Sequence, residues 1–192
     1  GLDVDLNADW EIYDFCKILK EKFKIDPLDT TLKKVVEALG KLKLIEDTPQ
    51  ALESVSIERG VDLLWKSIRK EIAGPGFLIN VPVYLEPLAK RNRNNPKTVE
   101  RFQVILAGSE MGKGFSELND PIDQRGRFME QQALRDAGDE EAQMADMEFV
   151  EALEYAMPPA FGFGLSERLF SFLTDKPVRE TQLFPLLKPT KN

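Results

Sequence analysis

The segment 102–117 is typical of a β-hairpin, and the order of elements after it restricts the possible folds. Two runs of strand-forming residues, 102–107 and 110–117, flank Gly108 and Ser109, which we expect to form a two-residue turn. Hydrophobic spacing and capping residues then predict, in order, a helix over 121–137, a helix over 147–157, a strand over 161–165 and a helix capped by Ser166. Strands and helices do not alternate regularly, as a doubly wound parallel sheet requires. We therefore predict an α+β fold in which helices flank an antiparallel β-sheet.

The part of the chain before the hairpin is predicted to be mainly helical. Alternating apolar and acidic residues predict a strand over 2–6, and apolar residues at helical spacing predict a helix over 8–23. Residues 24–76 are predicted to be a helical insert. Its two helices and the strand that follows it are expected at 31–42, 61–73 and 77–81.

The composition excludes several kinds of chemistry. The sequence contains no histidine and a single cysteine, Cys16. Catalysis by Ser-His-Asp or Cys-His groups, histidine-ligated metals, cysteine zinc sites and internal disulfides are therefore excluded. Chemistry in this chain must use carboxylates, arginine, lysine, hydroxyls, backbone dipoles or a hard cation such as Mg²⁺ that is held by oxygen atoms.

Charge and hydropathy argue against two classes of partner, nucleic acids and membranes. The net charge of −7 argues against nucleic-acid binding through electrostatics alone. No apolar run approaches the ~20 residues of a membrane span, and no secretory leader opens the sequence. We expect a cytoplasmic location and no membrane partner. Because the sequence begins with Gly1 rather than methionine, we expect a fragment of a longer polypeptide or a residue added for expression.

The strand 110–117 carries charged residues that could form a site. Strand alternation places Lys113, Phe115 and Glu117 on one face and Glu110 on the other. The glycines between them would permit a β-bulge, which would let the two carboxylates converge on Mg²⁺ and its phosphate ligands. The alternative is a solvent-facing strand with ordinary surface glutamates. Phe115, beside these charges, could form the wall of an amphipathic pocket.

The segment 158–168 combines a glycine-containing strand with an arginine at the start of a helix. Gly162 and Gly164 would let a ligand approach the backbone closely. Arg168 in the first turn of the following helix would form an anion site. The alternative is an arginine that forms a surface salt bridge.

Together these stretches resemble class II aminoacyl-tRNA synthetases, and most closely the lysyl-tRNA synthetase family. The residues 167–189 are similar to motif 3 and the C-terminal end of the catalytic domain of that family. The resemblance is strongest over 82–189. Further similar runs lie at 87–90, 110–124, 127–128, 136–139 and 152–159.

The resemblance implies a function and a set of site residues. The class II fold would activate lysine with ATP and then transfer it to tRNA. Glu110 and Glu117 stand where the family binds Mg²⁺ and ATP, and Arg168 stands where a catalytic arginine holds the ATP phosphates. Phe115 and Glu117 stand where the family holds the stem and the ammonium of the substrate lysine. Lys113 replaces an asparagine that lies near the substrate carboxylate.

The glycines at 162 and 164 are also expected to belong to the amino-acid site. The chemistry fits a chain without histidine, because the substrate carboxylate is already a nucleophile. Adenylation needs alignment and charge neutralisation at phosphorus rather than a general base.

The resemblance identifies residues 1–192 as the C-terminal part of a catalytic domain. Motif 1, the motif 2 arginine and the anticodon-binding domain would lie outside it. We therefore expect little activity from the isolated chain and a homodimer for the longer polypeptide. Two alternatives remain open, namely a paralogue of altered amino-acid specificity, which Lys113 suggests, and a non-catalytic binding or regulatory module.

Overall fold

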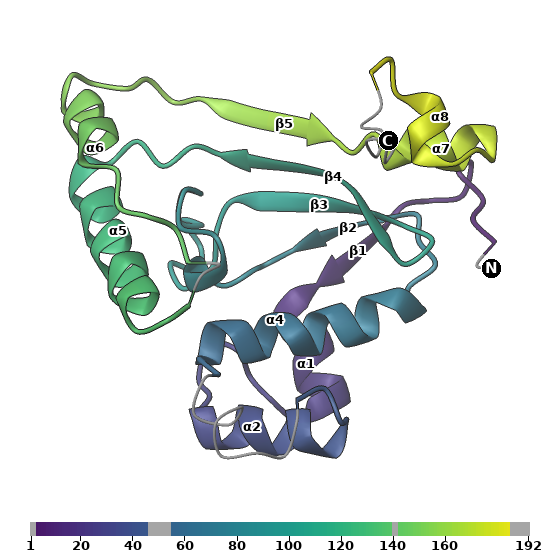
Figure 1. Cartoon of the computed structure of the whole chain (residues 1–192), viewed down its shortest axis with the longest axis horizontal. Coiled ribbons are helices and arrows are strands. Elements are labelled where there is room, and N and C mark those ends of the chain that lie inside the picture. The colour runs from purple at the N-terminus through teal and green to yellow at the C-terminus, as the bar shows by residue number, and fades with distance from the viewer. Residues whose placement is uncertain (1–2, 46–54, 140–141, 185–192) are drawn as a thin grey trace, which may run out of the picture.

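The computed structural model describes residues 3–45, 55–139 and 142–184 (Figure 1). Five strands form one sheet in the order β1-β2-β3-β4-β5. The strands are β1 (Glu11–Asp14), β2 (Gly76–Ile79), β3 (Arg101–Leu106), β4 (Ser109–Ser116) and β5 (Phe161–Leu165). The pair β1–β2 is parallel, and the other three pairs are antiparallel. The predicted α+β fold with a mainly antiparallel sheet is confirmed.

The helices that precede β2 connect the two parallel strands. They are α1 (Phe15–Phe23), α2 (Leu32–Lys41) and α4 (Ile57–Ile68), followed by the short 3-10 helix η1 (Arg69–Glu71). In Figure 1 they gather below the sheet. Buried Leu39 of α2 and Leu64 of α4 belong to the same hydrophobic cluster as Leu78 and Ile105 of the sheet. The helices within 24–76 therefore pack on one sheet face and serve as a crossover between neighbouring strands.

The remaining helices lie at the two ends of the sheet (Figure 1). At one end lie α5 (Pro121–Asp136) and α6 (Met147–Glu154), and at the other lie α7 (Arg168–Thr174) and α8 (Val178–Thr181). A second 3-10 helix, η2 (Val83–Leu85), follows β2. Asp120 caps α5 by accepting a hydrogen bond of 2.9 Å from the backbone N–H of Ile122, as its Asp-Pro start predicts. No helix in the described ranges is both long and apolar enough to cross a bilayer.

The first strand lies later in the chain than the sequence predicts. Residues 3–6 form no strand, and residue 2 lies outside the described part of the chain. The strand is β1, and α1 begins at Phe15 rather than near residue 8. The Asp14 carboxylate accepts a hydrogen bond of 2.9 Å from Lys17 N, which fixes the start of α1. The prediction was wrong because residues 11–14 pair with a strand 65 residues further on, which no local periodicity reveals.

The turn of the predicted hairpin is displaced by one residue. Ala107 and Gly108, rather than Gly108 and Ser109, occupy the positions between β3 and β4. Their φ angles of 48° and 70° are both positive, as in the type I′ turns that connect the strands of two-residue β-hairpins. A Cβ atom at Gly108 would lie 2.9 Å from the carbonyl oxygen of Lys70, so glycine is required by space as well as by conformation.

Candidate functional site

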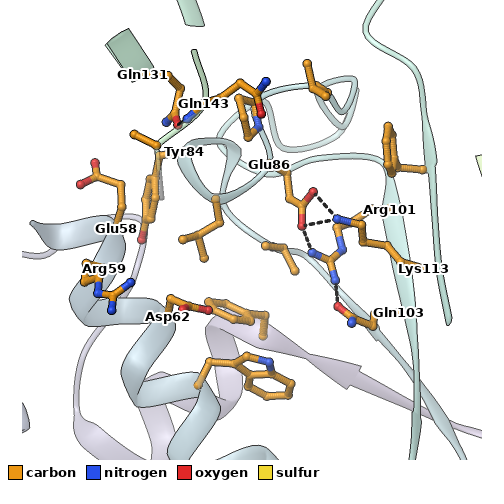
Figure 2. Close-up of a pocket in the computed structure, with 18 of the residues that line it drawn as sticks. Glu58, Arg59, Asp62, Tyr84, Glu86, Arg101, Gln103, Lys113, Gln131 and Gln143 are labelled. Atoms are coloured by element: carbon orange, nitrogen blue, oxygen red, sulfur yellow. Dashed lines mark hydrogen bonds and ion pairs between the residues drawn. The ribbon is translucent and has the colours of Figure 1, made fainter. Parts of the chain in front are cut away.

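A cavity of about 520 Å³ lies between α4, α5 and the face of the sheet that carries the main hydrophobic cluster. Figure 2 shows Glu58 and Asp62 on the helix side, and Arg101 and Lys113 on the strand side. The polar lining residues from α4, from the segment after η2 and from β3 and β4 are Glu58, Arg59, Asp62, Glu86, Arg101, Gln103, Glu110 and Lys113. Trp65 and Phe115 contribute aromatic walls.

A β-bulge brings Glu110 into this cavity. The register of β3 and β4 shifts between Val104 and Ile105, so that Val104 faces Gly112 and Ile105 faces Glu110. Met111 is the extra residue, and the bulge moves Glu110 to the sheet face that also carries Lys113. The bulge that the glycine-containing sequence permits is therefore present.

An ion-pair cluster forms the strand side of the cavity. Glu86 forms an ion pair with Arg101, and Arg101 also donates a hydrogen bond to the side-chain oxygen of Gln103. Lys113 Nζ lies 3.2 Å from Oε2 of Glu86. The Arg101 side chain is 6% exposed and that of Glu86 is 13% exposed. Burial lowers the pKa of Arg101, although Glu86 and Glu110 oppose that effect, and the guanidinium stays charged at neutral pH.

Sequence reasoning missed Glu86, Arg101 and Gln103. The polar residues at positions 101 and 103 could have been predicted as site residues. They lie in a strand that is otherwise apolar, and strand alternation places both on one face. No local pattern predicts that Glu86 belongs to the site, because it follows a 3-10 helix and pairs with a residue 15 positions away.

The carboxylate of Glu110 is oriented from the helix layer. Oε1 of Glu110 accepts a hydrogen bond of 3.0 Å from Trp65 Nε1. The same oxygen lies 4.0 Å from Arg69 Nε. Glu110 therefore has fixed partners on α4 and η1 while its side chain still lines the cavity.

Glu117 lies at the other end of β4. Its backbone N–H donates to Ala160 O at 3.0 Å, and its carboxylate lies against β5, where a Cβ atom at Gly162 would approach Oε1 to 2.9 Å. Gly162 pairs with Phe115 and Gly164 pairs with Lys113 across β4 and β5. The structure thus brings Glu117 close to Gly162. Among the described residues, Glu117, Gly162 and Gly164 are not part of the cavity lining.

Glu110 and Glu117 lie towards opposite ends of β4. They are seven residues apart on an extended strand, which at about 3.3 Å per residue separates their backbones by roughly 20 Å. The bulge places Glu110 on the sheet face that also carries Lys113 and Glu117. Within the described ranges, no group of three or more Asp, Glu, His or Cys residues is arranged to hold a metal. Binding of Mg²⁺ by Glu110 and Glu117 stays a prediction.

Arg168 lies apart from the cavity. It is the first residue of α7, directly after the turn that follows β5, and it is exposed. Its backbone N–H donates to Oγ of Ser166 at 3.3 Å. Its side chain forms no ion pair within the part of the chain that the structure describes. The structure therefore places Glu110 and Lys113 in one cavity and Arg168 outside it.

Comparison with known proteins decides the family. Residues 5–188 match the family described as tRNA synthetases class II (D, K and N). The chain belongs to this family. The class II synthetase chain is 42% identical to the lysine–tRNA ligase of Thermotoga maritima, over 100% of its own length and 37% of that relative.

Two further relatives agree. The lysine–tRNA ligase of Thermosipho africanus is 40% identical over 98% of the chain, and that of Moorella thermoacetica is 38% identical over 98%. The class II chain spans about 37% and 38% of the length of these two relatives. In this class II chain, the matched residues form the mainly antiparallel sheet with its flanking helices.

Proposed function

We propose that this chain is the C-terminal part of the catalytic domain of a lysine–tRNA ligase. The longer polypeptide would activate L-lysine with ATP to lysyl-adenylate and transfer the lysyl group to tRNA. The observation that carries the proposal is the 42% identity to lysine–tRNA ligases along the whole chain. The role in protein synthesis makes a cytoplasmic location part of the same proposal.

The proposed first step needs charge and alignment rather than a base. The lysine carboxylate attacks the α-phosphorus of ATP, an oxygen–phosphorus bond forms, and pyrophosphate leaves with the electrons of the broken bond. Developing charge on the phosphates calls for cationic groups, and the chain supplies these without histidine. In the proposal Arg168 holds the ATP phosphates, and Lys113 lies near the substrate carboxylate.

The remaining proposed contacts hold the side chain of the substrate. Phe115 contacts its apolar stem, and Glu117 binds its ammonium, with Gly162 leaving space beside the carboxylate of Glu117. A buried ammonium needs such a partner, because an unpaired charge in a dry pocket costs several kcal/mol. Of the two carboxylates considered for Mg²⁺, Glu110 lines the cavity. We therefore propose that Glu110 binds the Mg²⁺ ion that the ATP phosphates also bind.

The test is lysine-dependent exchange between ATP and pyrophosphate in the longer polypeptide that carries this chain. Replacing Arg168→Ala or Glu117→Gln should lower exchange at least tenfold, on the order expected for one lost charged contact. Unchanged exchange in both variants would contradict the site assignment. The isolated chain should show little exchange, and robust activity in it would contradict the need for further catalytic residues.

A second candidate is a paralogue that activates a different amino acid or transfers it to another acceptor. The ion pair between Lys113 and Glu86 favours this candidate, because it places an extra cation inside the cavity. A panel of amino acids in the exchange assay separates the two candidates. Exchange that depends on lysine alone would rule out altered amino-acid specificity.

Association of two polypeptides is also part of the proposal. Phe161, Phe163 and Leu165 project from the sheet face opposite the cavity, and each is more than half exposed. Such a row of apolar side chains on one sheet face supports a contact with further protein. Sedimentation of the longer polypeptide at several concentrations tests whether it is a dimer.

A further inference from the structure

Lysines are concentrated in the segment 17–43, which carries α1 and α2. This segment contains eight lysines and four acidic residues, whereas the whole chain contains 26 basic and 33 acidic residues. The segment is therefore a basic region of an acidic chain. Figure 1 shows α2 on the side of α4 that faces away from the sheet. The lysines of α2 are exposed, so their charge lies on the outer surface of the helical layer.

A groove of about 380 Å³ lies between the C-terminal end of α1 and one face of α2. Lysines line it from both helices: Lys22 and Lys24 lie at the end of α1, and Lys34 and Lys41 lie on α2. All four residues are exposed. Glu37 is the acidic residue that also lines this α1–α2 groove. Cations therefore outnumber anions in the lining by four to one.

The lysines of the groove have few counter-charges. Among the described residues, Lys34 and Lys41 form no ion pair. Lys22 Nζ lies 3.5 Å from Oε2 of Glu71, but both side chains are more than half exposed and solvent screens such a pair. Lys24 Nζ donates to a backbone carbonyl oxygen at 3.2 Å. Like charges that converge on one groove repel each other, and an anion bound there relieves that repulsion.

The neighbouring acidic residues of α1 and the following loop are paired with other lysines. Lys17 Nζ lies 3.9 Å from the carboxylate of Glu21, and Lys20 Nζ lies 3.1 Å from that of Asp26. These carboxylates are not part of the groove lining. They therefore balance charge beside the groove rather than inside it.

The local charge, rather than the net charge, determines whether a polyanion binds here. At physiological ionic strength the Debye length is about 8 Å, so acidic residues on distant surfaces of the chain are largely screened from this groove. The net charge of −7 argues against nucleic-acid binding through the electrostatics of the whole chain. It does not argue against binding at one basic groove.

We propose that the α1–α2 groove binds the phosphate backbone of RNA. The choice of RNA among polyanions rests on the proposed function, in which the longer polypeptide transfers a lysyl group to tRNA. The proposal adds a contact surface outside the cavity between α4, α5 and the sheet. The apolar residues of the groove lining are Phe23, Ile25, Ala38 and Leu42. Lysine stems lie along such apolar surface while their ammonium groups stay in water, within reach of phosphate oxygens.

The chemistry of lysine predicts what this contact reads. An ammonium group is a compact point charge that attracts phosphate without the fixed geometry of a guanidinium. Contacts to phosphates position a nucleic acid but carry no sequence information. We therefore expect binding at the groove to depend strongly on salt and little on RNA sequence.

The test measures binding of a fluorescein-labelled RNA hairpin to the 192-residue chain by fluorescence anisotropy at several salt concentrations. The variant combines Lys34→Gln with Lys41→Gln. At low salt it should bind roughly tenfold more weakly than the unmodified chain, because two phosphate contacts are lost. The slope of the logarithm of affinity against the logarithm of salt concentration should become shallower by about 2.

The matched control combines Lys66→Gln on α4 with Lys176→Gln directly after α7. It removes the same charge from two exposed positions outside the groove. It should keep the affinity and the salt slope of the unmodified chain. Urea denaturation should give the same midpoint for both double variants, which shows that a loss of RNA binding is not a loss of folding.

Three outcomes would overturn the proposal. The first is that the unmodified chain does not bind the hairpin at low salt, and the second is that both double variants bind it equally well. The third is that Lys34→Gln with Lys41→Gln loses affinity for poly-L-glutamate but not for the hairpin, which would identify an acidic protein as the partner. Exchange between ATP and pyrophosphate involves no RNA, so a failure of the groove and a failure of the proposed catalytic site are told apart by the two assays.

Discussion

Trp65 on α4 donates a hydrogen bond of 3.0 Å from its indole Nε1 to Oε1 of Glu110 on β4. The indole ring is buried and packs against Phe15, with 5.4 Å between the ring centroids. This contact joins the helix layer to the bulged strand and sets the direction of a carboxylate that lines the cavity. The position of Glu110 therefore depends on a helix residue that lies 45 positions earlier in the chain.

Replacing Trp65→Phe should remove this hydrogen bond while keeping most of the aromatic packing. We expect the free energy of unfolding to fall by about 1 to 2 kcal/mol, because the indole N–H bonds a charged, partly exposed acceptor. Urea denaturation measures this loss. Trp10→Phe is the matched control, since the Trp10 ring is partly exposed and its Nε1 donates to Leu6 O at 3.4 Å. Equal losses in the two variants would show that the Trp65–Glu110 bond contributes nothing specific.

Replacing Glu86→Gln should destabilise the chain far more than replacing Lys113→Met. Arg101 would keep a neutral acceptor but lose its buried counter-charge, at a cost of about 3 kcal/mol. Loss of the exposed partner Lys113 should cost less than about 1 kcal/mol. Urea denaturation of both variants gives the two values. Similar small losses would mean that water, rather than Glu86, stabilises the charge of Arg101.

Adding a methyl group at Gly162 should disturb the carboxylate of Glu117. A Cβ atom there would lie 2.9 Å from Oε1, closer than carbon normally approaches oxygen, whereas a Cβ atom at Gly164 meets nothing within 4 Å. In the longer polypeptide, Gly162→Ala should raise the KM for lysine by roughly threefold to tenfold, because the proposed ammonium partner is displaced. Gly126→Ala on α5, where a Cβ atom also meets nothing within 4 Å, is the control and should leave this KM unchanged. Equal KM values in both variants would argue against a role of Glu117 in binding lysine.

Because of the Asp123 carboxylate, the free energy of unfolding should change with pH in the acidic range. Burial alone would raise the pKa of Asp123, but hydrogen bonds from Arg127 and Arg91 outweigh burial and lower the pKa to about 2. The unfolded-state pKa is about 3.9. Because the folded-state pKa is the lower of the two, the stabilisation is fully present above the unfolded-state value. It is lost as the pH falls from about 5 towards 2.

The expected contribution of Asp123 at neutral pH is about 2 kcal/mol. Urea denaturation of the unmodified chain and of Asp123→Asn should therefore differ by about this amount at pH 7, and by much less near pH 2.5. Glu37→Gln, at an exposed position on α2, should show no such change with pH. A difference between Asp123→Asn and the unmodified chain that stays constant over this range would contradict the predicted linkage.

Much of the secondary structure could be predicted because its causes are local. The helices expected at 31–42 and 61–73 correspond to α2 and to α4 with η1, since apolar residues three and four positions apart mark one helix face. Asp120 and Pro121 fixed the start of α5 in the same way. The absence of histidine, a property of composition alone, excluded whole classes of catalysis.

The site depends on contacts that no local pattern encodes. The partners of β1 and of Glu110 lie 65 and 45 residues away, and Glu86 pairs with Arg101 across a loop. The sequence permitted a bulge, but the pairing of β3 with β4 placed it at Met111 and decided which face Glu110 occupies. Capping and helical spacing act between residues a few positions apart, so the sequence by itself determined the helices and the available chemistry. Which charged groups meet is decided by the chain topology, because it brings distant segments within the few ångströms over which hydrogen bonds and ion pairs form.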